Sequence, residues 1–402
     1  MQIYDRERQG CSTKRRISKC IFRQSIPPCR ADIDNGKHGD QEKGATGLFF
    51  SRNSVFARSV RSCHARIGVV SPGSGAVQRQ LFLLEAPIGI WALPGVVGFL
   101  VGYFVPYERW KKIALPLLFV GIGCLALVFT RFGTEINSTN RWLRFGPIQF
   151  QPAEIVKLIY ILYVAAWLSN ARLKREHDIR SGLIPFLLVS GVIAGLLILQ
   201  PATSTVAILL GSGLVVYFVS GAPKRYLVGI MLLAVLIIAA VIYITPYRRA
   251  RILGFLNQSV DTQGQNYQVN QALIAIGSGG LWGVGYGQST TKANLPAVID
   301  DSIFAVIGEE LGFVGAATLT ILFCLFGLRL FWDARQVSDR FGRLLLVGIG
   351  TVISVQAFVN IASTAGVIPL TGVPLPFVSY GGTALAAFLT MSGIAVNVTK
   401  NT

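Results

Sequence analysis

From residue 81 onward, long apolar stretches alternate with short polar segments. A helix rises 1.5 Å per residue, and stretches of this length suit a hydrocarbon layer of ~30 Å. The pattern therefore predicts an all-α polytopic membrane protein with about nine transmembrane helices. The apolar stretches lie at about 81–104, 113–130, 155–169, 183–199, 203–221, 226–245, 303–331, 343–361 and 383–398.

Composition supports this interpretation, since 52% hydrophobic residues, 14% charged residues and a mean hydropathy of +0.55 exclude a single soluble globule. The formal charge of +18 does not indicate nucleic acid, because the basic residues lie in the N-terminal tail and in short loops. The basic loop 170–182 is predicted to be cytoplasmic. Alternation then places 131–154, the large loop 246–302 and the segment 362–382 on the outer face.

The N-terminal segment conflicts with this topology. Residues 1–80 hold fifteen Lys/Arg and six Asp/Glu, a net charge of 15 − 6 = +9, and such a tail normally stays in the cytoplasm. One following helix would place it outside instead. We expect residues 1–78 to form a basic, disordered extension and residues 79–400 to form the membrane domain.

The candidate chemistry begins with carboxylates in 295–312, where Asp300 and Asp301 precede an apolar helix that carries Glu309 and Glu310. Charged residues at a membrane boundary are candidates for function. The three histidines lie in the tail and in a cytoplasmic loop, so a proton acceptor on the outer face has to be a carboxylate. Adjacent aspartates repel, which raises the pKa of one of them and suits it to act as a base. For the two glutamates, hydrogen bonds in helix packing are the favoured interpretation.

Cationic residues on the same predicted face are candidates for binding an anion. Glu154 and Lys157 are three residues apart and share one helical face, so they form either a local ion pair or part of an anion site with Arg141. Arg248, Arg249 and Arg251 follow a predicted helix on the outer side, against the usual bias, so they either bind a polyanionic ligand or snorkel from the end of the helix.

The remaining motifs are less informative. Residues 265–287 predict a short amphipathic helix that ends in a glycine cluster, and 200–205 predicts a turn. GVGYG at 283–287 lacks the threonine and the pore helix of a potassium filter, which argues against a channel. The cysteines lack the spacing of metal ligands, and no metal site is predicted from them.

Four ordered motifs between about 79 and 400 resemble the SEDS family of FtsW and RodA, bacterial cell-wall polymerases that elongate glycan strands from lipid II. They are RWLRFGPIQFQPAEIVKL, IAIGSGGLWGVGYG, LP followed by DSIFAVIGEELG, and PLTGVPLPFVSYGGT. AVIGEELG and STTKANLP are more similar to the FtsW branch, which acts in cell division. The resemblance implies a SEDS-type bundle of ten helices with both termini inside, of which the first is absent or replaced here.

The resemblance also implies roles for individual residues. The family's essential aspartate, a general base, falls on Asp301, and its basic residues fall on Arg141 and Lys157, partners for the pyrophosphate of lipid II. With these we place Glu154 and Arg251 in the substrate site, and Ser379, Gly381 and Gly382 in the cavity wall. No cofactor is assigned, and a divalent cation requirement stays open. The implied partners are lipid II, a class B penicillin-binding transpeptidase and other divisome proteins, at the septum of the bacterial inner membrane.

The sequence departs from the family pattern near these positions. Ile299, Asp300 and Ser302 surround the expected base, Ala153 replaces a serine, and Ala202 and Ser204 replace an aspartate and a glycine. Three interpretations therefore stay open: an inverting lipid II polymerase that needs Asp301, a lipid II flippase, and a catalytically inactive division scaffold.

Overall fold

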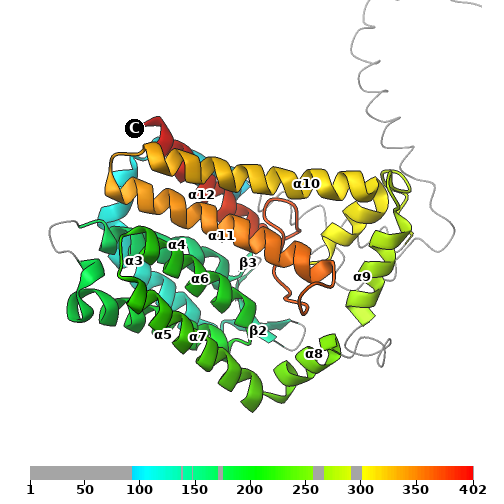
Figure 1. The fold of residues 1–402 in the computed structure, drawn as a ribbon, viewed down its shortest axis with the longest axis horizontal. Coiled ribbons are helices and arrows are strands. Elements are labelled where there is room, and N and C mark those ends of the chain that lie inside the picture. Colours follow the sequence, from blue (N-terminus) through cyan, green and yellow to red (C-terminus); the bar gives the residue numbers. More distant parts are fainter. Residues whose placement is uncertain are drawn as a thin grey trace, which may run out of the picture. The chain divides into compact units, whose positions relative to one another are not determined.

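The computed structural model describes residues 93–136, 139–146, 148–170, 175–256, 267–290 and 301–401. The expected N-terminal extension and Asp300 lie outside these residues. The described chain is mainly helical (Figure 1). After the helix Leu93–Phe104, its helices are α3 (Tyr107–Leu127), α4 (Pro152–Leu168), α5 (Ile184–Leu199), α6 (Thr203–Val219), α7 (Lys224–Ile244), α8 (Pro246–Leu256), α9 (Tyr267–Ser278), α10 (Ile303–Gln336), α11 (Arg340–Thr364) and α12 (Gly382–Lys400).

The helices confirm the hydrophobic pattern. Within the described residues, six helices are long and apolar enough to span a membrane, counting 179–199 as one, and Leu93–Phe104 and α6 are shorter apolar helices. Pro152 occupies the first turn of α4, where its missing N–H costs nothing. The predicted short helix in 265–287 is α9. The turn predicted at 200–205 is shorter, since residues 200–202 join α5 to α6 and Thr203 already begins α6.

Helix α4 lies at the centre of the bundle. It packs against α3, α6, α11 and α12, and almost all of its side chains are buried. Small residues allow this close packing, as is usual between membrane helices. The Tyr160 hydroxyl lies so near Gly213 of α6 that a Cβ there would collide with it, and the same hydroxyl is 2.8 Å from Oγ of Ser190 in α5. Helix α7 instead has no buried residue, as expected for a helix that mainly faces lipid.

Helices α10 and α11 lie side by side (Figure 1), and α10 is interrupted near its start. Gly312 has φ 67°, a left-handed conformation that a side chain would strain. The loop after α9 bonds to the backbone groups around the break: Val284 N–H donates to Glu309 O at 2.9 Å and Phe313 N–H donates to Gly280 O at 2.9 Å. The glycine cluster thus completes a broken transmembrane helix.

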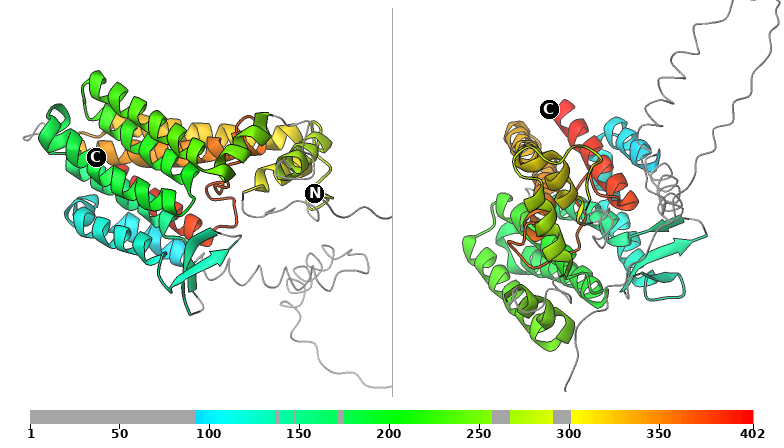
Figure 2. Two further views of the ribbon diagram at one scale, coloured as in Figure 1. Left: turned by 90° about the horizontal axis from the view of Figure 1, so that it is seen from below. Right: turned by 90° about the vertical axis from the view of Figure 1, so that its right-hand side faces the viewer.

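A small antiparallel sheet was not predicted. Strands β1 (Gly133–Ile136), β2 (Thr139–Phe145) and β3 (Ile148–Phe150) pair in the order β1-β2-β3 and lie where α3 ends and α4 begins (Figure 2). The strands are too short and too rich in turn residues to show a clear period of two along the sequence. Leu143, at the centre of β2, is fully buried and anchors the sheet to the bundle.

At the opposite end of the bundle, the predicted cytoplasmic loops converge. Arg340, at the start of α11, lies 2.8 Å from the Glu176 carboxylate and donates to Ser220 O at 2.9 Å. Asp178 caps the helix that follows it by accepting from Ser181 N–H at 2.8 Å, and this bond lowers the pKa of its carboxyl. The basic loops therefore share one end, and the candidate site residues share the other.

Candidate functional site

Asp301 lies immediately before α10 and is half-buried. Its side-chain Oδ1 accepts from Gln268 Nε2 of α9 at 3.2 Å, and Gln268 also donates to Ser302 Oγ at 3.0 Å. Its main-chain carbonyl accepts from Asn360 Nδ2 of α11 at 2.9 Å. Both the carboxylate and the peptide that carries it are thus held by neighbouring helices.

Gly372 brings the segment 371–374 against this carboxylate. A Cβ at Gly372 would lie 3.5 Å from Asp301 Oδ2, and the residue has φ +63°. Only glycine adopts this conformation without strain. The segment 371–374 belongs to the motif PLTGVPLPFVSYGGT, and Asp301 begins the motif DSIFAVIGEELG. Two of the four motifs therefore meet at Asp301.

The segment 371–374 also forms one wall of a small polar cavity of about 20 Å³, which is room for about one water. Arg141, Glu154 and Arg251 line this cavity, so three predicted site residues from separate elements come together. The rest of its lining comes from Gln151, the 201–205 turn and Thr371, Gly372, Val373 and Pro374.

The cationic side chains of this cavity are engaged in hydrogen bonds. Arg141 Nε donates to Gln200 O at 2.9 Å, and its terminal nitrogen donates to Pro201 O. Arg251 donates to Leu370 O at 3.1 Å. These acceptors are neutral main-chain carbonyls, and the bonds to them hold both guanidinium groups at the cavity.

Lys157 lies deeper. Its Nζ is 2.7 Å from Glu154 Oε2, the ion pair that the three-residue spacing predicted, and the two side chains are 0% and 2% exposed. The same ammonium donates to Gln356 Oε1 of α11, and Gln356 Nε2 donates to Pro374 O at 2.9 Å. Lys157 therefore supports the cavity wall from behind and does not line the cavity.

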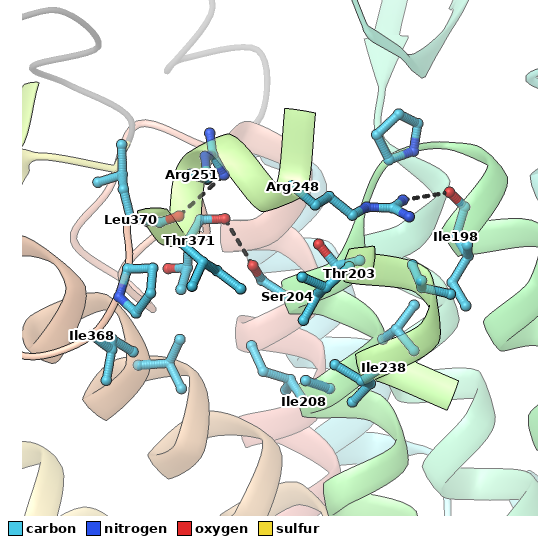
Figure 3. Close-up of a pocket in the computed structure, with 18 of the residues that line it drawn as sticks. Ile198, Thr203, Ser204, Ile208, Ile238, Arg248, Arg251, Ile368, Leu370 and Thr371 are labelled. Carbon is cyan, nitrogen blue, oxygen red and sulfur yellow. Dashed lines mark hydrogen bonds between the residues drawn. The ribbon is translucent and has the colours of Figure 1, made fainter. Parts of the chain in front are cut away.

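An apolar groove of about 440 Å³ adjoins the polar cavity (Figure 3). Its walls come from α6, α7, α8, α11 and residues 368–371, with Ile208, Ile238 and Ile368 among the apolar side chains. Arg248 and Arg251 lie along α8 at its polar end (Figure 3). Pro201, Thr203, Ser204, Thr371 and Arg251 line both spaces, so the two are adjacent. Together they suit an amphiphile with an anionic head and an apolar tail.

The other predicted residues have structural contacts. Glu309 is buried and accepts from the Ser289 hydroxyl and from Thr290 N–H at 3.0 Å, so its hydrogen bonds hold the preceding loop, as the packing interpretation expected. Ser379 Oγ accepts from Leu375 N–H at 2.7 Å within its own turn. Gly381 precedes α12, where an added Cβ would lie 3.8 Å from Pro374, and Gly382 begins α12; neither glycine lines the polar cavity or the apolar groove.

The departures from the family pattern also fall in this region. Ala202 and Ser204 line the polar cavity, and Ser204 Oγ donates to Thr371 O at 3.0 Å. The described residues contain no group of three or more metal-ligating His, Cys, Asp or Glu side chains.

Sequence reasoning missed three amides: Gln268, Gln356 and Asn360. The last two were detectable, since they are amides four residues apart in the otherwise apolar stretch 343–361, and polar groups inside a membrane helix are candidates for function. Gln268 gave no such signal, because glutamine is ordinary on an amphipathic helix in a loop.

Fold and site together define a polytopic membrane protein in which the Asp301 carboxylate lies beside the wall of a polar cavity lined by two arginines, with an apolar groove next to it. Residues 74–402 match the family model FTSW_RODA_SPOVE, described as a cell cycle protein. The chain belongs to this family.

Relatives and solved structures agree with this assignment. A Geobacter protein named as a probable peptidoglycan glycosyltransferase FtsW is 34% identical over 311 residues, covering 77% of this chain and 84% of the relative. A structure titled as the structural coordination of polymerization and crosslinking by a peptidoglycan synthase complex is 32% identical with a TM-score of 0.66, covering 88% of this chain and 99% of that one. The rod shape determining protein RodA of Thermus thermophilus is 28% identical with a TM-score of 0.58, covering 88% and 98%.

Proposed function

We propose that this protein is a peptidoglycan glycosyltransferase that polymerises lipid II into glycan strands during septal wall synthesis. The observation that carries the proposal is the position of Asp301 beside the wall of a cavity that joins a cationic polar end to an apolar groove. The family assignment and the names of the relatives support the same activity.

In this proposal Asp301 acts as the general base. Its carboxylate takes the proton from the acceptor sugar hydroxyl, whose oxygen forms a bond to the anomeric carbon of the growing strand. The bond from that carbon to the pyrophosphate breaks, and undecaprenyl pyrophosphate leaves with inversion. Gln268 orients the carboxylate through its 3.2 Å bond to Oδ1.

Arg251 and Arg141 bind the departing pyrophosphate, and the apolar groove takes the adjoining isoprenoid. The groove volume lies in the range of ordinary ligand sites. The polar cavity has room for about one water in this conformation, so the pyrophosphate requires an outward movement of the Arg251 side chain or of the segment 371–374. Lys157 and Glu154 hold the wall, which changes the direct anion-binding role expected for Lys157 into a supporting one.

The partner and location follow by the same inference. A solved relative is titled as part of a peptidoglycan synthase complex, which supports assembly with a class B penicillin-binding transpeptidase. The protein would then act with other divisome proteins in the bacterial inner membrane at the division septum, with Asp301 facing the periplasm.

Reconstitution into vesicles with fluorescent lipid II tests the proposal. Wild-type protein should produce polymer, and Asp301→Asn should abolish it. The matched control is Asp333→Asn, at the far end of α10, where the carboxylate pairs with Arg329 at 3.1 Å. Label that crosses the bilayer without forming polymer would favour the flippase, and the absence of both activities from folded protein would favour the scaffold.

A further inference from the structure

Asn360 joins the two segments that meet at the candidate base. Its Nδ2 donates to Asp301 O at 2.9 Å and to Val373 O at 2.7 Å. Asp301 lies two residues before the start of α10, and Val373 follows Gly372, where an added Cβ would lie 3.5 Å from Asp301 Oδ2. One amide nitrogen therefore fixes both sides of the contact between the carboxylate and the cavity wall.

The position of Asn360 is rigid. The side chain is fully buried in α11, and its own carbonyl accepts from Ser363 Oγ at 3.0 Å and from Thr364 Oγ1 at 2.8 Å. One turn earlier on the same helix, Gln356 donates to Pro374 O and accepts from Lys157. The two amides bind consecutive carbonyls, those of Val373 and Pro374, so α11 fixes the position of the segment 371–374.

Stability alone does not explain Asn360. Its Oδ1 is buried without a hydrogen-bond partner among the described residues, and an unsatisfied buried oxygen is costly. A membrane-spanning helix accommodates an apolar residue at lower cost. What the amide supplies is a forked donor aimed at two carbonyls from separate segments.

We propose that Asn360 is a positioning residue, which sets the Asp301 carboxylate at a defined distance from the cavity wall. This inference rests on the proposed function of Asp301. Asn360 does not touch the substrate; it acts through the backbone of Asp301 and Val373. Its loss should therefore lower kcat much more than it raises the KM for lipid II, because neither Asp301 nor Val373 lines the apolar groove.

The test uses full-length protein in lipid nanodiscs. Asn360→Asp keeps the shape of the side chain but leaves at most one donor for the two carbonyls, and Asn360→Ala removes both donors without adding a carboxyl group. Asn397 gives a matched control, since it is a buried asparagine of α12 that bridges Tyr107 N–H at 2.9 Å and Tyr103 O at 2.6 Å at the other end of the bundle. Asn397→Asp and Asn397→Ala carry the same chemical changes away from the site.

Two readouts separate the inference from the proposed function. The Asn360 variants should lower kcat by roughly 100-fold, the size expected when a reacting group is misplaced by about 1 Å. They should also speed hydrogen exchange at least about tenfold in peptides covering 301–305 and 371–376, because both segments lose a tether. The Asn397 variants should do neither.

If hydrogen exchange in peptides 301–305 and 371–376 were equally fast in the Asn360 and Asn397 variants, Asn360 would not hold the two segments together. Faster exchange with unchanged kcat, while Asp301→Asn abolishes polymer, would overturn the positioning role alone. If wild-type protein made no polymer, the proposed function would fail, and the exchange comparison would still decide whether Asn360 joins the two segments.

Discussion

The buried ion pair between Glu154 and Lys157 allows a quantitative test of how the centre of the bundle is held. With 2.7 Å between the charged atoms and an effective dielectric constant of ~20, the attraction is 332/(20 × 2.7), or about 6 kcal/mol. Desolvation of two buried ions costs several kcal/mol each, so the net contribution of the pair is small. Removing one partner, in contrast, leaves an uncompensated charge.

Lys157→Met should therefore lower the free energy of unfolding by about 3–5 kcal/mol. The double variant Glu154→Met, Lys157→Met removes both charges and should lose only about 1–3 kcal/mol, since Gln356 Oε1 is then left without its donor. The double variant is thus expected to be more stable than the single one.

Unfolding free energies measured by SDS titration in mixed micelles would check this order. Arg329→Met is the matched control, because Arg329 pairs with Asp333 four residues along α10 but is 74% exposed, and its loss should cost at most about 0.5 kcal/mol. If the double variant loses more stability than Lys157→Met alone, the two charges do not compensate each other and the reasoning is refuted.

Three further predictions concern the end of the helix bundle that contains Asp301. Gly372→Ala should cost about 1–2 kcal/mol of stability, because a side chain is strained at φ +63°, and displacement of the segment 371–374 beside Asp301 should remove most of the polymerase activity. Gly366→Ala, at φ +69°, should carry similar strain with normal kcat, because its Cβ would meet Leu273 and not Asp301; equal activity losses would argue against a special role of Gly372. Arg251→Gln should raise the KM for lipid II about tenfold with little change in kcat, and an unchanged KM in steady-state assays would remove Arg251 from the substrate site. Glu309→Ala should lower the free energy of unfolding by about 2–3 kcal/mol, because the hydrogen bonds from Ser289 and Thr290 are lost. A decrease below about 0.5 kcal/mol would show that Glu309 does not hold this loop.

Much of the fold was predictable because its signals are local. The apolar stretches correspond to helices, Pro152 begins α4, and the ion pair of Glu154 and Lys157 forms at helical spacing. The small sheet was missed because its strands are short. The role of Lys157 was also harder to predict, since its contact with Gln356 joins residues 199 positions apart.

The site itself depended on distant contacts. Asp301 was identifiable as a candidate, but its neighbours were not, because Gln268, Asn360 and Gly372 come from three other segments. The local sequence does not indicate which main-chain carbonyl will accept a hydrogen bond from a buried side-chain amide.

The sequence by itself determined that this chain crosses a membrane many times and which charged residues flank its apolar stretches. Helix formation in a bilayer follows from the length and apolarity of each stretch, since every backbone group has to be satisfied within its own segment. Only the tertiary structure decided that Arg141, Arg251 and residues 371–374 enclose one cavity beside Asp301. That convergence depends on how helices pack across long separations, where close-fitting side chains and a few buried hydrogen bonds select one arrangement among many.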